Sequence, residues 1–155
     1  MVLGFKTHIN GQPTFFIEKI LTCVSAYYSQ MFLPKKHSIR EGKRWTAGRK
    51  IHMATGVRTT KYNQFNKFIA GLDTCKSVQD IAIKWKLTEG DDVNNPFVTL
   101  VGKRCVWIKV DGRLLDKDEV RTLALNDGFD GILQFLDWFK NDIDGQIIHW
   151  TDLKY

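Results

Sequence analysis

The sequence contains few of the residues that build metal sites or disulfide frameworks. Its 155 residues include three cysteines (Cys23, Cys75 and Cys105) and four histidines. The cysteines are odd in number and scattered, no Cys-x-x-Cys occurs, and the histidines lack the spacing of zinc ligands. We therefore expect no metal, and no cofactor motif is visible. Free thiols in a chain of this length favour a reducing compartment, the cytoplasm.

Long hydrophobic runs and linker-like segments are also missing. The longest apolar run near the N-terminus is far shorter than the about 20 residues of a membrane span, so we expect no membrane partner. Lys6 and His8 follow Met1 almost at once and no apolar h-region comes next, so we expect no signal peptide. The composition, 43% hydrophobic and 26% charged, is that of a folded globular protein. Without repeats or a Pro/Ser-rich linker, the sequence predicts a single domain over residues 1–155.

Acidic residues are scarce in the first half of the chain. Residues 1–72 contain twelve Lys and Arg but only Glu18 and Glu41, whereas residues 73–155 contain eleven Lys and Arg and fifteen Asp and Glu. The net charge of +6 thus combines a strongly basic half with a mildly acidic one. The densest segment, residues 35–61, has nine basic residues and one acidic residue. Such a segment either attracts a polyanion, most commonly nucleic acid, or forms a solvated face.

Apolar periodicity predicts about six strands. Apolar residues alternate from Ile81 to Leu87, which is typical of a half-buried strand. Further strands are expected near residues 2–8, 50–54, 97–101, 104–110 and 146–151. The dipeptides Asn10-Gly11 and Asp111-Gly112 predict tight turns, residues 89–92 predict another turn, and Gly102-Lys103 predicts the tip of a hairpin.

Three helices are expected between these strands. One runs from about Thr14 to Met31, one covers residues 117–126 after an Asp116 N-cap, and one follows an Asp130 N-cap. Helices segregated between short strands predict an α+β fold, specifically a small mixed β-barrel or curved sheet, rather than alternating βαβ units.

The string from Lys35 to Trp45 is the richest concentration of candidate functional groups. If Ser38-Ile39-Arg40 is extended, Ser38 and Arg40 share one face, and either Lys35 or Lys36 joins them, depending on the turn of the chain. A lysine whose pKa is lowered by burial or neighbouring cations can accept a hydroxyl proton. An arginine fork can hold a carboxylate, carbonyl or phosphate. A phosphate-binding loop is the simpler interpretation, with His37 pointing away from the pocket.

A second string, residues 126–130 (Asn-Asp-Gly-Phe-Asp), joins the last two helices. Asp130 is explained as an N-cap, but the helical pattern gives Asp127 no role. We expect Asp127 either to pair with a Lys or Arg of the first string or to be a solvated turn residue.

Taken together, the two strings resemble the ASCH domain, a branch of the PUA-like superfamily. Residues 35–40 read Lys-x-x-Ser-x-Arg with a glycine at Gly48, which is similar to the family's Lys-x-x-Thr/Ser-x-Arg motif and downstream glycine. The Gly-Phe-Asp helix start at 128–130 and a closing strand containing Trp150 follow in the same order. The resemblance covers roughly residues 14–153 and implies a small PUA-like β-barrel of about six strands with flanking helices.

The resemblance also implies a catalytic possibility. Some bacterial members of the family are acetylcytidine amidohydrolases, and their lysine, threonine and glutamate fall on Lys35, Ser38 and Asp127. Serine keeps the hydroxyl nucleophile, whereas aspartate is one methylene shorter than glutamate, and an ångström of misplacement can cost on the order of 10²-fold in rate. The chain also has extra material at 23–34 and 56–78 compared with those compact enzymes.

Two functions are therefore weighed. The favoured one is an RNA- or nucleotide-binding domain, in which basic side chains attract phosphates and loop aromatics stack on bases. The alternative is an amidohydrolase acting on an acylated nucleoside, with Ser38 as nucleophile, Lys35 as base and Asp127 as acid. The expected ligand-binding residues are Lys36, Arg40, Lys43, Arg44, Trp45, Arg58, Lys61 and Tyr62. Trp45 either stacks or anchors its loop in the core, Tyr62 is expected to be exposed, and the oligomeric state stays open.

Overall fold

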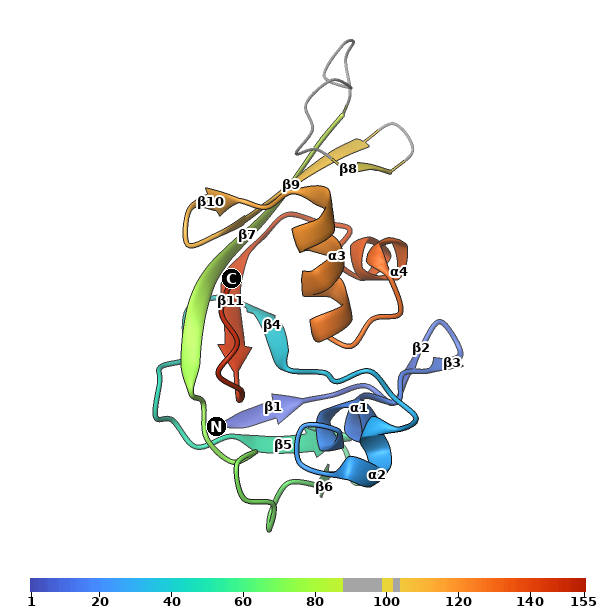
Figure 1. Cartoon of the computed structure of the whole chain (residues 1–155), viewed down its shortest axis with the longest axis vertical. Helices are drawn as coiled ribbons and strands as arrows, with labels where there is room; N and C mark the ends of the chain where they lie inside the picture. The colour runs from blue at the N-terminus through green and yellow to red at the C-terminus, as the bar shows by residue number, and fades with distance from the viewer. Residues whose placement is uncertain (88–98, 102–103) are drawn as a thin grey trace.

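The computed structural model describes residues 1–87, 99–101 and 104–155 and has an α+β fold, as predicted (Figure 1). The helices are α1 (Phe16–Leu21), α2 (Ala26–Ser29), α3 (Lys117–Asn126) and α4 (Ile132–Trp138). The strands are β1 (Val2–Gly4), β2 (His8–Ile9), β3 (Gln12–Pro13), β4 (His37–Glu41), β5 (His52–Thr55), β6 (Asn63–Gln64), β7 (Ser77–Leu87), β8 (Thr99–Val101), β9 (Arg104–Val110), β10 (Arg113–Leu114) and β11 (Ile143–His149).

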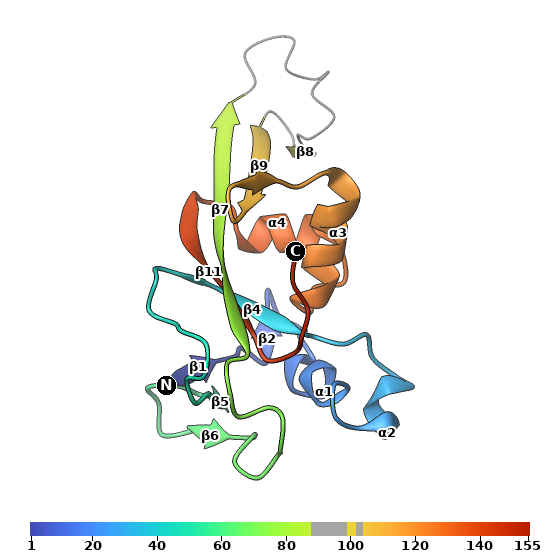
Figure 2. The same cartoon turned by 60° about the vertical axis from the view of Figure 1, so that its left-hand side comes forward.

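The main sheet is antiparallel and carries the predicted strand β7 at its centre. Its strand order is β10-β9-β7-β11-β4, with β8 paired to β9. Helices α3 and α4 lie against one side of it (Figure 2). Ile83, Ile108, Leu123 and Phe135 are at most 1% exposed and belong to one apolar core that the sheet and these helices share. This burial is the main driving force for the packing of the two layers.

A smaller sheet, β1-β5-β6, packs beside the open edge at β4. Its parallel β1–β5 pair places Leu3 opposite Met53, and both side chains are buried. Backbone hydrogen bonds between residues 48–51 and 73–75 join the start of β5 to the segment that leads into β7. On the other side, Arg40 of β4 donates from Nη2 to the carbonyl of Gly4. The smaller sheet is thus joined to the main sheet at two places, the start of β5 and the end of β1.

The predicted tight turns are confirmed. Asn10 and Gly11 have φ of 50° and 77°, and Asp111 and Gly112 have φ of 49° and 82°. Two successive positive φ values are typical of the type I′ turns that close two-residue hairpins, here β2–β3 and β9–β10. The predicted hairpin between 97 and 110 is confirmed for the paired strands β8 and β9. Residues 97–98, Gly102-Lys103 and the turn predicted at 89–92 lie outside the described residues.

The helix predicted from Thr14 to Met31 is wrong in its extent. It divides into α1 and α2, because the amides of Cys23 and Val24 donate to carbonyls three residues back and close a tight last turn after Leu21. Thr22 Oγ1 also donates to the carbonyl of Lys19, a side-chain bond that competes with helical geometry.

Of the two predicted N-caps, one is confirmed and the other is wrong. Asp116 caps α3 through a capping box with Glu119, as expected for an acidic residue at this position. Asp130 does not cap α4, whose N-cap residue is Gly131. The carboxylate of Asp130 instead accepts a hydrogen bond from Lys19 Nζ at 2.6 Å. Lys19 lies more than 100 residues earlier, which a local pattern cannot reveal.

Candidate functional site

Lys35 and Asp127 form a buried ion pair between the start of β4 and the end of α3. Lys35 lies two residues before β4, and Asp127 is the C-cap residue of α3. Lys35 Nζ donates to Asp127 Oδ1 at 2.6 Å and also to the backbone carbonyl of Asp127. The two side chains are only 2% and 4% exposed. Of the two alternatives for Asp127, the structure therefore shows pairing with the first string, and it is Lys35 rather than Lys36 that turns inward.

Gly128 makes the close approach of Lys35 possible. Its φ of +89° ends α3 in the left-handed region that favours glycine. A Cβ at this position would lie 2.9 Å from Cδ of Lys35 and 3.1 Å from the ring of Phe16. The ammonium of Lys35 in turn lies 4.7 Å from the centroid of the Phe16 ring and 5.8 Å from that of Phe5. Two aromatic rings and a glycine thus border the space that the Lys35 side chain occupies.

Burial governs the protonation of this pair. Loss of solvation lowers the pKa of Lys35 to about 8, although the carboxylate of Asp127 opposes the change. The same loss of solvation raises the pKa of Asp127, against the stabilising charges of Lys35 and Arg40. Each partner favours the ionised form of the other while the surroundings favour the neutral forms. Burial would therefore destabilise either charge if its partner were absent.

Arg40 lies beside the pair, and Ser38 lies close in the chain but makes no hydrogen bond with Lys35. The guanidinium of Arg40 packs on the ring of Phe5, with 5.7 Å between Cζ and the centroid, and burial lowers its pKa. Ser38, on the same face of β4, is 2% exposed. Among the described residues no hydrogen bond joins its hydroxyl to the ammonium of Lys35. The motif therefore converges for Lys35, Arg40 and Asp127, while Ser38 stands apart from the ion pair.

The sequence interpretation missed a polar cluster behind the pair. His37, expected to point away from the pocket, is 0% exposed, with Nδ1 3.7 Å from Oδ1 of Asp127. Its Nε2 lies 2.7 Å from the hydroxyl of Tyr155, and this hydroxyl accepts a hydrogen bond from Asn126 Nδ2 at 3.0 Å. Burial and the charge of Lys35 lower the pKa of His37 well below its usual value, so the ring is neutral. The one sequence signal for this cluster was the alternation of side chains along β4, which places His37 on the same face as Ile39.

All three predicted ligand-binding arginines line one surface hollow, which we call the arginine hollow. It has a volume of about 760 Å³ and lies between residues 1–3, the end of β4 and residues 57–58. Arg40, Arg44 and Arg58 line it, and Glu41 is the acidic residue of its lining. The backbone of Arg44 is braced by Arg49, whose Nη1 donates to the Arg44 carbonyl at 2.6 Å. The hollow therefore combines several guanidinium groups with a fixed backbone.

Trp45 lines the arginine hollow but is not a free stacking platform. It is 5% exposed and belongs to the apolar core. Its backbone amide donates to Gln146 Oε1 at 2.9 Å, and its carbonyl accepts from Gln146 Nε2 at 3.2 Å. Of the two roles considered for Trp45, the structure therefore shows the anchor. This corrects its assignment as a ligand-binding residue that stacks on a base.

The remaining predicted residues lie around the hollow or away from it. Lys43 is exposed and paired with Asp80 at 2.5 Å, outside the hollow. Lys36 is partly buried, and its backbone amide donates to the carbonyl of Asn126. Lys61 and Tyr62 are exposed on the segment 55–62, and Tyr62 is 46% exposed, as expected.

Comparison with protein-family models, with curated proteins and with solved structures gave no match. The described residues include no group of three or more His, Cys, Asp or Glu side chains placed to hold a metal ion. Within the same residues, none of the helices has the length and apolar character of a membrane span. The site is therefore argued from the chemistry of this chain alone.

The buried pair predicts that stability rises at alkaline pH. Lys35 titrates near pH 8 in the folded protein and near 10.5 in the unfolded chain, so between these values the unfolded state binds more protons. The free energy of unfolding gains up to about 3 kcal/mol from this group across the window, and the gain is absent below it. Urea titrations between pH 7 and 10.5 measure this gain as a difference from the variant Lys35→Met/Asp127→Asn, which titrates at neither position. A difference that is independent of pH would contradict the lowered pKa.

Proposed function

We propose that this chain is an RNA- or nucleotide-binding domain of the ASCH type, with the arginine hollow as its phosphate site. The observation that carries the proposal is the convergence of Arg40, Arg44 and Arg58 on one hollow whose lining has a single carboxylate. Guanidinium forks match the geometry of phosphate oxygens and form charge-assisted hydrogen bonds with them. The volume of about 760 Å³ lies within the roughly 300–1,000 Å³ typical of small-molecule sites.

The three arginines reach the hollow with different degrees of constraint. Arg40 is held by the carbonyl of Gly4 and the ring of Phe5, so its position is fixed before a ligand arrives. Arg44 and Arg58 are exposed, and Arg58 is held in the left-handed region at a φ of 66°. An arginine in this uncommon conformation costs about 1–2 kcal/mol and persists only where its surroundings enforce it. A pre-oriented arginine beside two exposed ones is a suitable arrangement for holding an anion.

The proposal includes a PUA-like barrel as the fold. It is supported by the two connections between the sheets: the backbone ladder between residues 48–51 and 73–75, and the contact of Arg40 with Gly4. Under this interpretation β1 and β5 complete the curved surface begun by β7, β11 and β4. The arginine hollow then lies at the rim of the barrel, where β1 and β4 approach each other.

Replacing the two exposed arginines tests the phosphate site. We expect Arg44→Ala/Arg58→Ala to weaken binding of single-stranded RNA at least tenfold and to lower the slope of log affinity against log salt by about one to two. Arg121→Ala, an exposed arginine on α3 away from the hollow, is the matched control and should change neither quantity. Fluorescence anisotropy at several salt concentrations measures both. Salt-independent binding, or equal losses in the variant and the control, would overturn the phosphate site.

A second candidate function is favoured by one contact, the pairing of Lys35 with Asp127. In an amidohydrolase, neutral Lys35 would take the hydroxyl proton of Ser38 as its Oγ attacks the acyl carbon. Asp127 would orient Lys35 or return a proton to the leaving amine, and Arg40 or backbone amides would stabilise the oxyanion. The lowered pKa of Lys35 suits this base. Two observations argue against this mechanism. Lys35 and Ser38 are each only 2% exposed, and Lys35 Nζ already donates two hydrogen bonds to Asp127.

Acetylcytidine distinguishes this candidate from binding alone. If the chain is an amidohydrolase, absorbance shows deacetylation by the wild-type protein, and Ser38→Ala lowers the rate at least about 10²-fold through loss of the nucleophile. Ser29→Ala, at an exposed serine of α2, is the control and keeps full activity. No turnover by the wild-type protein, or equal turnover by Ser38→Ala, removes the amidohydrolase mechanism and leaves the binding proposal standing.

A further inference from the structure

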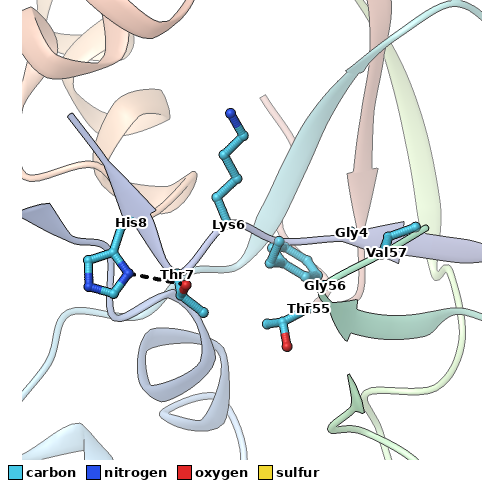
Figure 3. A pocket seen from close by; sticks show the side chains of 8 residues that line it. Gly4, Lys6, Thr7, His8, Thr55, Gly56 and Val57 are labelled. Atoms are coloured by element: carbon cyan, nitrogen blue, oxygen red, sulfur yellow. Dashed lines mark hydrogen bonds between the residues drawn. The ribbon is translucent and has the colours of Figure 1, made fainter. Parts of the chain in front are cut away.

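A second hollow lies next to the arginine hollow and has a different chemical character. Its volume is about 380 Å³, and it is lined by residues 4–8, which continue β1, and by residues 55–57 at the end of β5 (Figure 3). Residues 1–3 line the arginine hollow, and Val57 lines both. The two hollows therefore lie in series along the first eight residues, with Val57 between them.

The divider between the hollows is held in place by its neighbours. A Cβ on Gly4 would lie 3.0 Å from Cγ2 of Val57, so the absence of a side chain there lets Val57 rest on β1. Gly56 has a φ of +60°, and its carbonyl accepts hydrogen bonds from both the backbone amide and the hydroxyl of Thr59. The carbonyl of Lys61 leaves no space for a side chain at Gly56. Both hollows thus have a fixed shared wall.

The second hollow offers hydroxyl and imidazole groups beside a buried aromatic side chain. Thr7 and Thr55 contribute hydroxyls, and His8 contributes an imidazole whose Nδ1 lies 3.2 Å from Thr7 Oγ1. Phe5 also lines it and is itself 6% exposed. Figure 3 shows Lys6 extending away from Thr55, and its Nζ lies over the ring of Trp138 at 4.9 Å. No acidic side chain is among the residues that line this hollow.

These two environments match the alternation of charged phosphates with uncharged nucleosides along a nucleic acid strand. The arginine hollow suits a nucleotide held by its phosphate, and the second hollow suits the sugar and base of the next nucleotide, which need hydrogen-bonding groups and an apolar surface rather than positive charge. A base in a duplex is stacked and paired, so it cannot enter a separate hollow without leaving its partner. The ligand that fits both hollows together is therefore single-stranded.

We propose that the two hollows are adjacent subsites for one single-stranded RNA segment, so that a dinucleotide is the smallest ligand that fills both. The first nucleotide lies in the arginine hollow with its phosphate on the arginines, the second nucleoside lies in the second hollow, and the phosphodiester between them crosses Val57. This inference rests on the proposed RNA-binding function, and it adds the form of the ligand and a subsite built mainly by residues 4–8, which precede the basic segment.

A length series of ligands tests the inference. Isothermal titration calorimetry compares uridine 5′-monophosphate, the 5′-phosphorylated dinucleotide pUpU, a uridine tetranucleotide and an RNA duplex. We expect pUpU to bind at least tenfold more tightly than the mononucleotide, the tetranucleotide to gain only a few-fold more, and the duplex to bind more weakly than the tetranucleotide.

A matched pair of variants locates the second subsite. Thr7 lines the second hollow, Thr60 lines neither hollow, and both are exposed. We expect Thr7→Glu to abolish the advantage of pUpU over the mononucleotide and to leave mononucleotide affinity within twofold. Thr60→Glu brings the same charge near Arg58 and should weaken both ligands alike, so that their ratio is unchanged.

A crosslink provides a readout that needs no substitution. Irradiation of the wild-type protein with pUpU that carries 4-thiouridine at its second position should attach the base within residues 4–8 or 55–57, as mapped by mass spectrometry. Equal affinities of pUpU and the mononucleotide, equal effects of the two variants on their ratio, or crosslinks only elsewhere would overturn the two-subsite inference. Those results would leave phosphate binding intact, whereas absence of binding by every ligand at low salt would overturn the proposed function itself.

Discussion

The contact between Lys35 and Asp127 is the constraint on which the rest of the arrangement depends. It joins the basic first half of the chain to the acidic second half across 92 residues of sequence and fixes the start of β4 against the end of α3. Both charges are buried among apolar side chains, where removal of one partner of a buried pair costs about 3–5 kcal/mol because the other is left uncompensated. The cap glycine Gly128 and the rings of Phe5 and Phe16 are shaped around this contact.

Arg40 connects this interior pair to the surface. Its charge supports the ionised form of Asp127, its guanidinium packs on Phe5, and its Nη2 holds the carbonyl of Gly4 on β1. The same side chain forms part of the wall of the arginine hollow. The net basic charge of the first half is therefore not spread evenly over the surface. Lys43 and Lys50 are paired with aspartates, whereas the ion pairs of the described residues include none at Arg44 or Arg58. Attraction for an anion is thereby concentrated at one place.

The features that depend on residues close together in the sequence could be predicted. The Asn-Gly and Asp-Gly turns, the Asp116 cap and the alternation of β7 depend on residues close together in the chain, and the structure confirms them. The pairing of Asp127 was one of two alternatives because its partner is remote in sequence. The salt bridge from Asp130 to Lys19, the burial of His37 against Tyr155 and the anchoring of Trp45 by Gln146 were missed or left open for the same reason. Each contact spans about 100 residues or more, so only the assembled fold brings the two side chains together.

The most direct measurement is a double-mutant cycle on Lys35 and Asp127, with free energies of unfolding from urea titrations at pH 7. If the two side chains act as one unit, Lys35→Met and Asp127→Asn each destabilise the protein by several kcal/mol, and the double variant loses much less than their sum. The account predicts an interaction energy above about 2 kcal/mol. Losses that simply add, with an interaction energy near zero, would contradict the claim that this buried pair holds the two halves of the molecule together.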